Sequence, residues 1–92
     1  MEKAIVEIRY CTLCQWLFRA TWMAQELLNT FSQELGQVQL TPVQGGIYEI
    51  WINGTLVFSF KEERRFPEPK EIKQMVRDVI APEKNLGHSD KK

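Results

Sequence analysis

The chain has 92 residues, with twelve basic and twelve acidic side chains, two cysteines and one histidine, so its formal net charge is zero. A chain of this length forms one domain, and its 43% hydrophobic content is typical of a folded protein rather than a disordered one. The balanced charge argues against nucleic-acid binding, and no run reaches the roughly 18 apolar residues of a membrane span. Two cysteines are too few for a disulfide-stapled secreted scaffold, and strand-like residues at the N-terminus leave no room for a signal peptide. We therefore expect a small soluble cytoplasmic domain with no nucleic-acid or membrane partner.

The first half of the sequence predicts a strand, a long helix and a second strand. Residues 3–9 alternate and are rich in β-branched types, which is typical of a strand. Apolar residues then form one stripe at helical spacing: Leu13, Leu17, Ala20, Ala24, Leu27, Leu28, Phe31 and Leu35. The stripe predicts a helix of about 22 residues that begins at a Cys-Thr-Leu-Cys motif. Gly36 follows as a favourable C-cap, and residues 37–43 alternate again as a second strand.

The second half predicts a hairpin and an amphipathic helix. Asn53 and Gly54 separate the apolar runs 47–52 and 56–60, and Asn-Gly between such runs is a strong hairpin signal because both turn residues adopt positive φ. Residues 61–69 are interpreted as a charged loop. Residues 71–81 predict a helix that Pro82 ends, because five apolar residues recur at helical spacing: Ile72, Met75, Val76, Val79 and Ile80.

The order of these elements, β-α-β-β-β-α, specifies an architecture. Strand, helix and strand form a right-handed parallel crossover, and the hairpin adds an antiparallel pair to the same sheet. We expect an α/β, thioredoxin-like two-layer sandwich with a four-stranded mixed sheet and two helices. The domain is expected to span residues 1–82, with a loose polar C-terminal tail at 83–92.

Charged residues are unevenly distributed along the chain. Between Tyr10 and Phe60 only four residues are charged, whereas the last 32 residues carry sixteen charges. The four are Arg19, Glu26, Glu34 and Glu49. The first two-thirds of the chain must therefore form the core or face something other than water.

Cys11 and Cys14 are the candidate catalytic residues. The predicted elements place them where a strand ends and a helix begins, and the positive end of a helix lowers the pKa of a cysteine there and stabilises the reactive thiolate. The two-residue spacer lets one thiol resolve a mixed disulfide formed by the other. Beside a βαβ unit, Cys-x-x-Cys indicates a redox motif, so we predict thiol–disulfide exchange.

Other interpretations of the two cysteines remain open. A zinc site would need further ligands, and the chain offers only His88, so two copies would have to pool their motifs. The cysteines could be inert structural residues. They could also sense the redox state and gate a protein interaction without turnover, in which case partner affinity would change between the oxidised and reduced forms.

Several segments of the chain are similar to one known family. They are 10–17, 24–28 and 45–50, with shorter matches at 56–58, 66–68, 73–74, 76–78 and 86–90. Over nearly its whole length the chain resembles the selenoprotein W/T/H (Rdx) family, and above all its short cysteine-containing bacterial selenoprotein W-like members. The resemblance implies a thioredoxin-like fold and thiol-based redox reactions, with protein thiols or glutathione as partners. We expect no metal and no bound cofactor, with glutathione as a candidate co-substrate.

The resemblance also bears on the roles of individual residues. In selenium-containing members the second cysteine of the motif is selenocysteine; Cys14 matches that position with sulfur in place of selenium, and Cys11 matches its partner cysteine. This favours Cys14 as the attacking sulfur, whereas thioredoxin attacks with its first cysteine, so both assignments stay open. Thr12 and Leu13, between the cysteines, are candidate substrate or partner contacts.

Thioredoxins place a cis-proline opposite the motif. The corresponding stretch here is 44–47, which contains Gly45 and Gly46, and Pro42 lies too early to match. Paired glycines permit close backbone approach, so they are candidate contacts for a substrate chain near the disulfide. The alternative is that they only form a turn.

Aromatic residues follow the motif on the outer face of the predicted helix. Cys14, Phe18 and Trp22 recur every four residues, away from the apolar stripe. Large aromatic residues on such a face indicate a covered surface. One interpretation is a partner or homodimer surface that begins at the reactive cysteine, and the other is that sheet or loop of the same chain covers them. Trp16 borders the stripe and is expected to pack.

Two further features, His88 and the charged run 61–65, are interpreted as parts of the solvated surface. His88 lies in the polar tail and is interpreted as a tail residue rather than a catalytic base. Residues 61–65 alternate in charge and are interpreted as a solvated loop, with Arg64 and Arg65 as candidates for attracting the carboxylates of glutathione.

Overall fold

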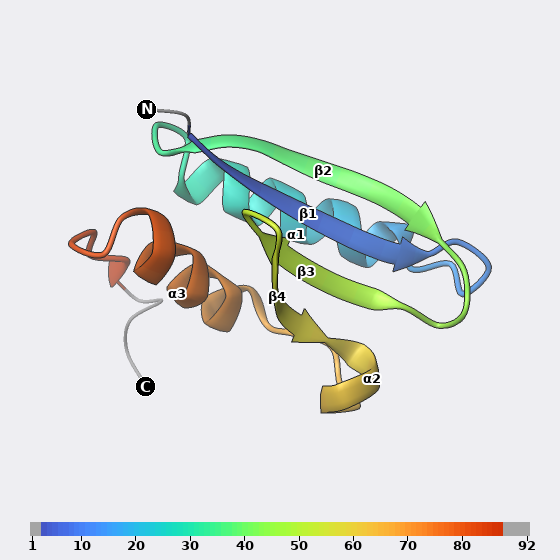
Figure 1. Ribbon diagram of the computed structural model, residues 1–92. Coiled ribbons are helices and arrows are strands. Elements are labelled where there is room, and N and C mark those ends of the chain that lie inside the picture. The colour runs from blue at the N-terminus through green and yellow to red at the C-terminus, as the bar shows by residue number, and fades with distance from the viewer. Residues whose placement is uncertain (1–2, 88–92) are drawn as a thin grey trace.

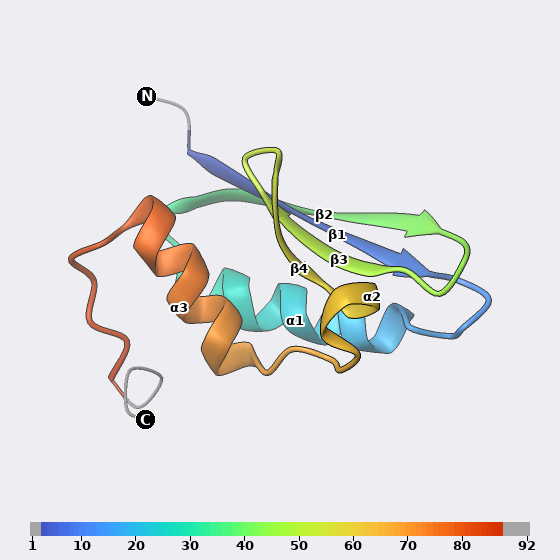
Figure 2. The same ribbon diagram turned by 60° about the horizontal axis from the view of Figure 1, so that its bottom comes forward.

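The computed structural model describes residues 3–87, and its elements form two layers (Figure 1). In chain order they are β1 (Ala4–Cys11), α1 (Leu17–Thr30), β2 (Leu35–Val43), β3 (Tyr48–Ile52), β4 (Thr55–Ser59), α2 (Phe60–Glu63) and α3 (Pro69–Ile80). The strands form one sheet in the order β2-β1-β3-β4, in which only the β1–β2 pair is parallel. The helices cover one face of this sheet (Figure 2). The predicted thioredoxin-like sandwich with a mixed four-stranded sheet is confirmed.

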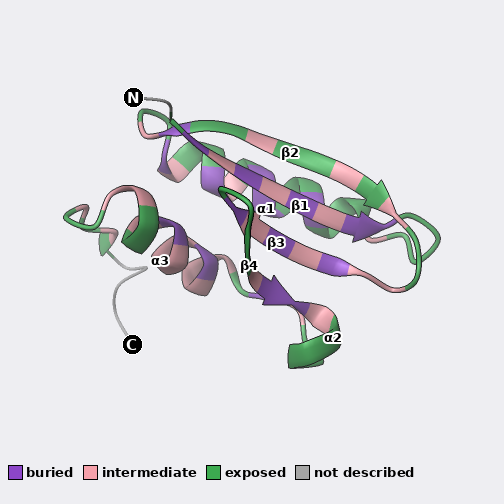
Figure 3. Ribbon diagram, in the orientation of Figure 1, coloured by how far each residue is buried: buried purple, intermediate pink, exposed green. Residues whose placement is uncertain are grey.

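The core lies between the sheet and the two long helices. Along β1 every second side chain is buried on the helix-covered face, and β3 shows the same alternation (Figure 3). The residues that fill the layer are Val6, Ile8, Ile50, Ile52, Phe58, Ala20, Met23, Ala24, Leu27, Phe31, Ile72 and Val76. Each large side chain buried in this way stabilises the fold by about 1.5–3 kcal/mol. The Leu/Ala part of the predicted stripe from Ala20 to Leu35 is therefore correct, apart from the exposed Leu28.

The first helix is shorter than its apolar stripe predicts. It has 14 residues, begins at Leu17 rather than at the motif, and ends at Thr30. Gln15 adopts a left-handed conformation (φ 60°), which is incompatible with a helix running back to Cys14. Leu13 and Leu17, which the stripe assigned to the core, are 78% and 48% exposed.

Gly36 does not cap this helix, so that prediction is wrong. It lies in β2, where an added Cβ would sit 3.0 Å from the Cβ of Lys3 and 3.1 Å from the carbonyl oxygen of Ala4. The glycine therefore allows the close approach of the chain to the start of β1. Its position in the sequence, after an apolar stripe, gave the same signal as a C-cap would.

The predicted Asn53-Gly54 hairpin is confirmed. Both residues have positive φ, 49° and 82°. The Asn53 side chain also accepts a hydrogen bond from the N–H of Ile5 (2.9 Å), and the Asn53 N–H donates to the Ile5 carbonyl (2.9 Å). The turn is thus fastened to β1 and fixes the register of the sheet at this end.

The segment predicted as a charged loop contains a third helix, α2. It is a single turn that ends where Arg64 takes a left-handed conformation (φ 59°). One turn is too short to produce an apolar period in the sequence, which is why it was missed. The last helix is confirmed but begins at Pro69, where a reciprocal capping box between Glu68 and Glu71 satisfies its first N–H groups.

The start of the predicted tail packs against the domain. Lys84 forms an ion pair with Glu34 (3.0 Å), and Leu86 contacts the core. His88 and the rest of the tail lie outside the described residues. Over the part of the chain that is described, none of the helices has the length and apolar character needed to cross a membrane.

Candidate functional site

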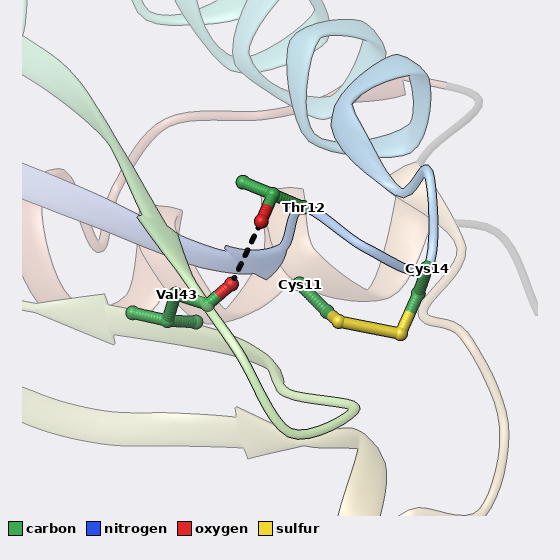
Figure 4. Close-up of a disulfide and its surroundings, with 4 residues drawn as sticks. All are labelled: Cys11, Thr12, Cys14 and Val43. Atoms are coloured by element: carbon green, nitrogen blue, oxygen red, sulfur yellow. Dashed lines mark hydrogen bonds between the residues drawn. A yellow bond between two sulfur atoms is a disulfide. The ribbon is translucent and has the colours of Figure 1, made fainter.

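The two cysteines meet at the end of the sheet and form a disulfide (Figure 4). Their Cα atoms are 5.4 Å apart. Cys11 is the last residue of β1 and only 1% exposed, whereas Cys14 lies in the exposed turn between β1 and α1. The strand therefore holds one sulfur inside the protein, and the turn presents the other to solvent.

The loop between β2 and β3 holds one side of the motif. The Cys11 N–H donates to the carbonyl oxygen of Ile47 (2.7 Å), and the Thr12 N–H donates to that of Val43 (3.0 Å). The Thr12 hydroxyl also donates to the Val43 carbonyl (3.4 Å; Figure 4). These bonds extend the sheet pairing of β1 up to the first cysteine.

Gly45 and Gly46 lie in this same loop. Both have positive φ, 88° and 69°, which a side chain at either position would strain. A Cβ added to either would meet nothing within 4 Å, so the space beside them is open. The structure thus brings the two glycines into the loop that holds Cys11, and their contact with a substrate stays a prediction. Among the described peptide bonds none is cis, and Pro42 pairs with Tyr10 in the sheet.

An aromatic cluster anchors the other side of the motif. It consists of Trp16, Tyr48, Phe60 and Phe66, with ring centroids 4.8–5.5 Å apart in each contacting pair. The backbone N–H of Trp16 also donates to the Cys11 carbonyl (3.3 Å) and so closes the turn. The packing predicted for Trp16 is confirmed. Trp16 packs against Phe60 and Phe66, and Tyr48 contacts Phe66. These three residues were missed because they are distant from Trp16 in sequence and no local pattern links them.

Buried polar groups of this cluster are paired. The Tyr48 hydroxyl donates to the Arg19 carbonyl (3.3 Å), and burial raises the pKa of this tyrosine, so it stays neutral. The Arg19 guanidinium lies 3.9 Å from the centre of the Phe66 ring, within the range of a cation–π contact. The aromatic cluster therefore supports the turn by packing, and its tyrosine does not act as an acid or base.

The positive end of α1 lies farther from the two cysteines than the sequence predicts. Because α1 begins at Leu17, its N-terminus lies three residues beyond Cys14 and six beyond Cys11. The influence of a helix dipole falls off within its first turn. The motif is thus a strand-end turn followed by a helix, which corrects the prediction of a motif at the first helical residues.

The aromatic residues that follow the motif are exposed. Phe18 is 78% exposed, whereas Trp22 is 46% exposed and so partly covered by the chain. Within residues 3–87 the interpretation that sheet or loop of the same chain covers this face is therefore wrong for Phe18. Leu13 precedes Cys14 in the turn and is also 78% exposed, so apolar side chains are exposed on both sides of this cysteine in the chain.

The two arginines named for glutathione differ in their surroundings. Arg65 forms a bidentate salt bridge with Glu71, which lowers the pKa of that carboxyl, and also approaches Glu63 (3.6 Å). Arg64 is exposed at the end of α2. Within residues 3–87, no three side chains of the metal-binding types come together.

Known proteins share this architecture. The model of the Rdx family matches residues 5–78. The solved structure of a selenoprotein W-related protein from Vibrio cholerae is 49% identical, with a TM-score of 0.82 over 85% of this chain and 98% of that chain. A solved structure from Bordetella parapertussis is 48% identical, with a TM-score of 0.83 over 86% of this chain and all (100%) of that chain.

A curated mouse protein, "Migration and invasion enhancer 1", is also similar. It is 34% identical over 74 residues, or 78% of this chain. The match spans only 61% of the mouse protein's own length. The likeness therefore concerns the shared domain.

Proposed function

The chain belongs to the Rdx family, and we propose that it carries out thiol–disulfide exchange at the Cys11–Cys14 pair. The observation that carries the proposal is the contrast between the two sulfurs, one buried at the end of a strand and one exposed in a turn. An exchange centre needs one sulfur that a substrate can reach and a second that only the first can reach. The sequence separation of three and the Cα distance of 5.4 Å suit such a pair.

The proposed reaction has two steps. In the reduced protein, the Cys14 thiolate attacks one sulfur of a substrate disulfide, forms a mixed disulfide and releases the other substrate sulfur as a thiolate, which takes up a proton. The Cys11 thiolate then attacks the Cys14 sulfur, forms the Cys11–Cys14 disulfide and releases the second substrate thiolate. Two electrons pass from the protein to the substrate. The same steps in reverse oxidise a dithiol.

Burial supports this division of roles. A substrate disulfide can approach Cys14 from solvent, while the strand and the Ile47 carbonyl hold Cys11 below the surface. Cys14 also occupies the position that resembles the selenocysteine of selenium-containing relatives. We therefore assign the attack to Cys14 and the resolving step to Cys11.

The proposal names protein thiols or glutathione as exchange partners and needs no bound cofactor, because the sulfurs carry the electrons. It also places the protein in the cytoplasm, where a reduced thiol pool can restore the dithiol form. In that compartment a substrate disulfide oxidises the Cys11–Cys14 pair, and the thiol pool reduces the pair again.

Two serine variants test the proposal. We expect Cys11→Ser to accumulate mixed disulfides through Cys14 when it is mixed with a disulfide substrate or a cell extract, because no sulfur resolves them. Cys14→Ser should accumulate few, because its remaining sulfur is buried. Mass spectrometry of the trapped adducts, before and after reduction, measures both.

The outcomes separate the interpretations. Trapping by Cys14→Ser alone would reverse the two roles. A wild-type protein that exchanges with no disulfide, yet changes its affinity for a partner between its oxidised and reduced forms, would contradict the proposed turnover and favour a redox-sensing interaction module.

A further inference from the structure

Exposed apolar side chains lie immediately before and after the exposed cysteine in the chain. We call the exposed side chains of Leu13, Leu17, Phe18 and Trp22 the apolar rim. Leu13 is next to Cys14 in the turn, and Leu17 begins the helix that follows. Phe18 and Trp22 are four residues apart, so they are neighbours on the helix surface. Each of the four is at least 46% exposed, and two are 78% exposed.

Both charged residues of α1 have partners within the domain. The helix contains two charged residues, Arg19 and Glu26. Arg19 lies over the Phe66 ring at 3.9 Å, and Glu26 forms an ion pair with Lys73 of α3 at 2.9 Å. The turn between β1 and α1, residues 12–16, contains no charged residue, so the segment that carries Cys14 offers no charged side chain of its own to an incoming molecule.

We propose that the apolar rim is the docking surface for a protein partner whose reacting disulfide lies beside exposed apolar side chains. This inference rests on the proposed function and narrows its substrate class. Glutathione disulfide carries carboxylates and ammonium groups close to its sulfur atoms, and desolvating them against an apolar surface without partners is unfavourable. A protein segment with leucine or aromatic side chains beside its disulfide buries them against the rim instead.

The site itself favours a partner over a second copy of this chain. A symmetric dimer closed through the rim would cover Cys14, which is the sulfur that must meet the substrate. A partner that brings its own disulfide to Cys14 covers the rim only while exchange takes place. The surface is then exposed in the free protein and buried in the mixed disulfide.

Two synthetic peptides provide the probe. Both contain one intramolecular disulfide; in the first the flanking residues are Leu and Phe, and in the second they are Ser. The reduced protein is mixed with each peptide, or with glutathione disulfide, and samples are quenched in acid. Mass spectrometry then gives the rate at which the Cys11–Cys14 disulfide forms.

We expect the apolar-flanked peptide to react at least about tenfold faster than the serine-flanked one and than glutathione disulfide. Phe18→Ser should bring the ratio of the two peptide rates close to one. Val79→Ser is the matched control, since Val79 is an exposed apolar residue (54%) at the far end of α3, and should leave the ratio unchanged. A ratio insensitive to salt would agree with apolar docking.

Three results would overturn the proposal. One is glutathione disulfide reacting as fast as the apolar-flanked peptide. Another is a rate ratio that Phe18→Ser leaves intact. The third is a stable dimer in sedimentation velocity that Phe18→Ser dissociates, because the rim would then be a contact between copies. If no disulfide reacts at all, the proposed function itself fails, and this inference fails with it.

Discussion

Reduction of the Cys11–Cys14 disulfide should lower the stability of the domain modestly and leave the sheet intact. The crosslink joins residues three apart in sequence and so closes a segment of only four residues. Chain entropy for so short a segment gives a loss of about 2 kcal/mol in the free energy of unfolding at 25 °C. For a domain of this size, that loss corresponds to a fall of roughly 8–16 °C in the unfolding midpoint.

The loss stays small because the disulfide lies at the edge of the core rather than within it. Neither cysteine belongs to the hydrophobic cluster that joins the sheet to α1 and α3. The backbone hydrogen bonds of Cys11 to Ile47 and of Thr12 to Val43 do not depend on the crosslink. A redox centre of this kind can cycle between two forms that are both folded. Urea unfolding of the oxidised and the phosphine-reduced protein measures the difference, and the urea dependence (m) should be the same for both.

The two serine variants act as internal controls. Cys14→Ser should match the reduced wild type, because residue 14 is exposed and its side chain contributes no packing. Cys11→Ser should lose about 1–3 kcal/mol more, because it places a hydroxyl in a buried position. A reduced form as stable as the oxidised one, or a loss of 4 kcal/mol or more on reduction, would refute the chain-entropy reasoning.

Three further changes test other parts of the structure. Gly36→Ala should destabilise the domain by about 1–3 kcal/mol in urea titration, because its Cβ would press on the carbonyl oxygen of Ala4 at 3.1 Å; an unchanged midpoint would contradict this. Trp16→Ala should cost about 3 kcal/mol and speed hydrogen exchange in the turn that carries the motif, since the aromatic cluster anchors it; protection equal to wild type would show that the anchor is elsewhere. Arg65 holds the pKa of the Glu71 carboxyl below its ordinary value, so this pair stabilises the fold at neutral pH and its contribution is lost as the pH falls through that lowered pKa. Glu71→Gln should therefore lower stability at pH 7 and flatten the loss on acidification, and parallel pH profiles for variant and wild type would refute the assignment.

The parts of the fold that follow from local patterns could be predicted from the sequence. Asn53-Gly54 specifies its hairpin because few residues adopt positive φ twice in succession, and the five apolar positions of α3 recur at helical spacing. The start of α1 could not be predicted in this way. Leu13 continues the apolar period, and only the left-handed conformation of Gln15 separates it from the helix. Glutamine carries no sequence signal for that conformation.

The candidate site likewise has a part that the sequence predicts and a part that only the fold reveals. The spacing of the cysteines is visible in the sequence, and it identifies the pair. Their unequal exposure is not, because it depends on β1 extending to Cys11, which in turn depends on hydrogen bonds to Val43 and Ile47 more than thirty residues away. The aromatic cluster behind the turn likewise assembles from four separate segments, so its members appear in the sequence as unrelated residues.

The scarcity of charge in the first two-thirds of the chain has two distinct physical origins. In β3 and on the sheet-facing side of α1 it reflects burial, since alternate residues of β3 and four residues of α1 fill the core. In the turn and along the outer side of α1 burial does not account for it, because Leu13 and Phe18 are 78% exposed. A side chain so exposed adds little to folding, and a polar residue would hold the same backbone equally well. We therefore propose that the apolar character of these positions serves a contact made outside the folded chain, and that the exchange partner docking at Cys14 supplies it.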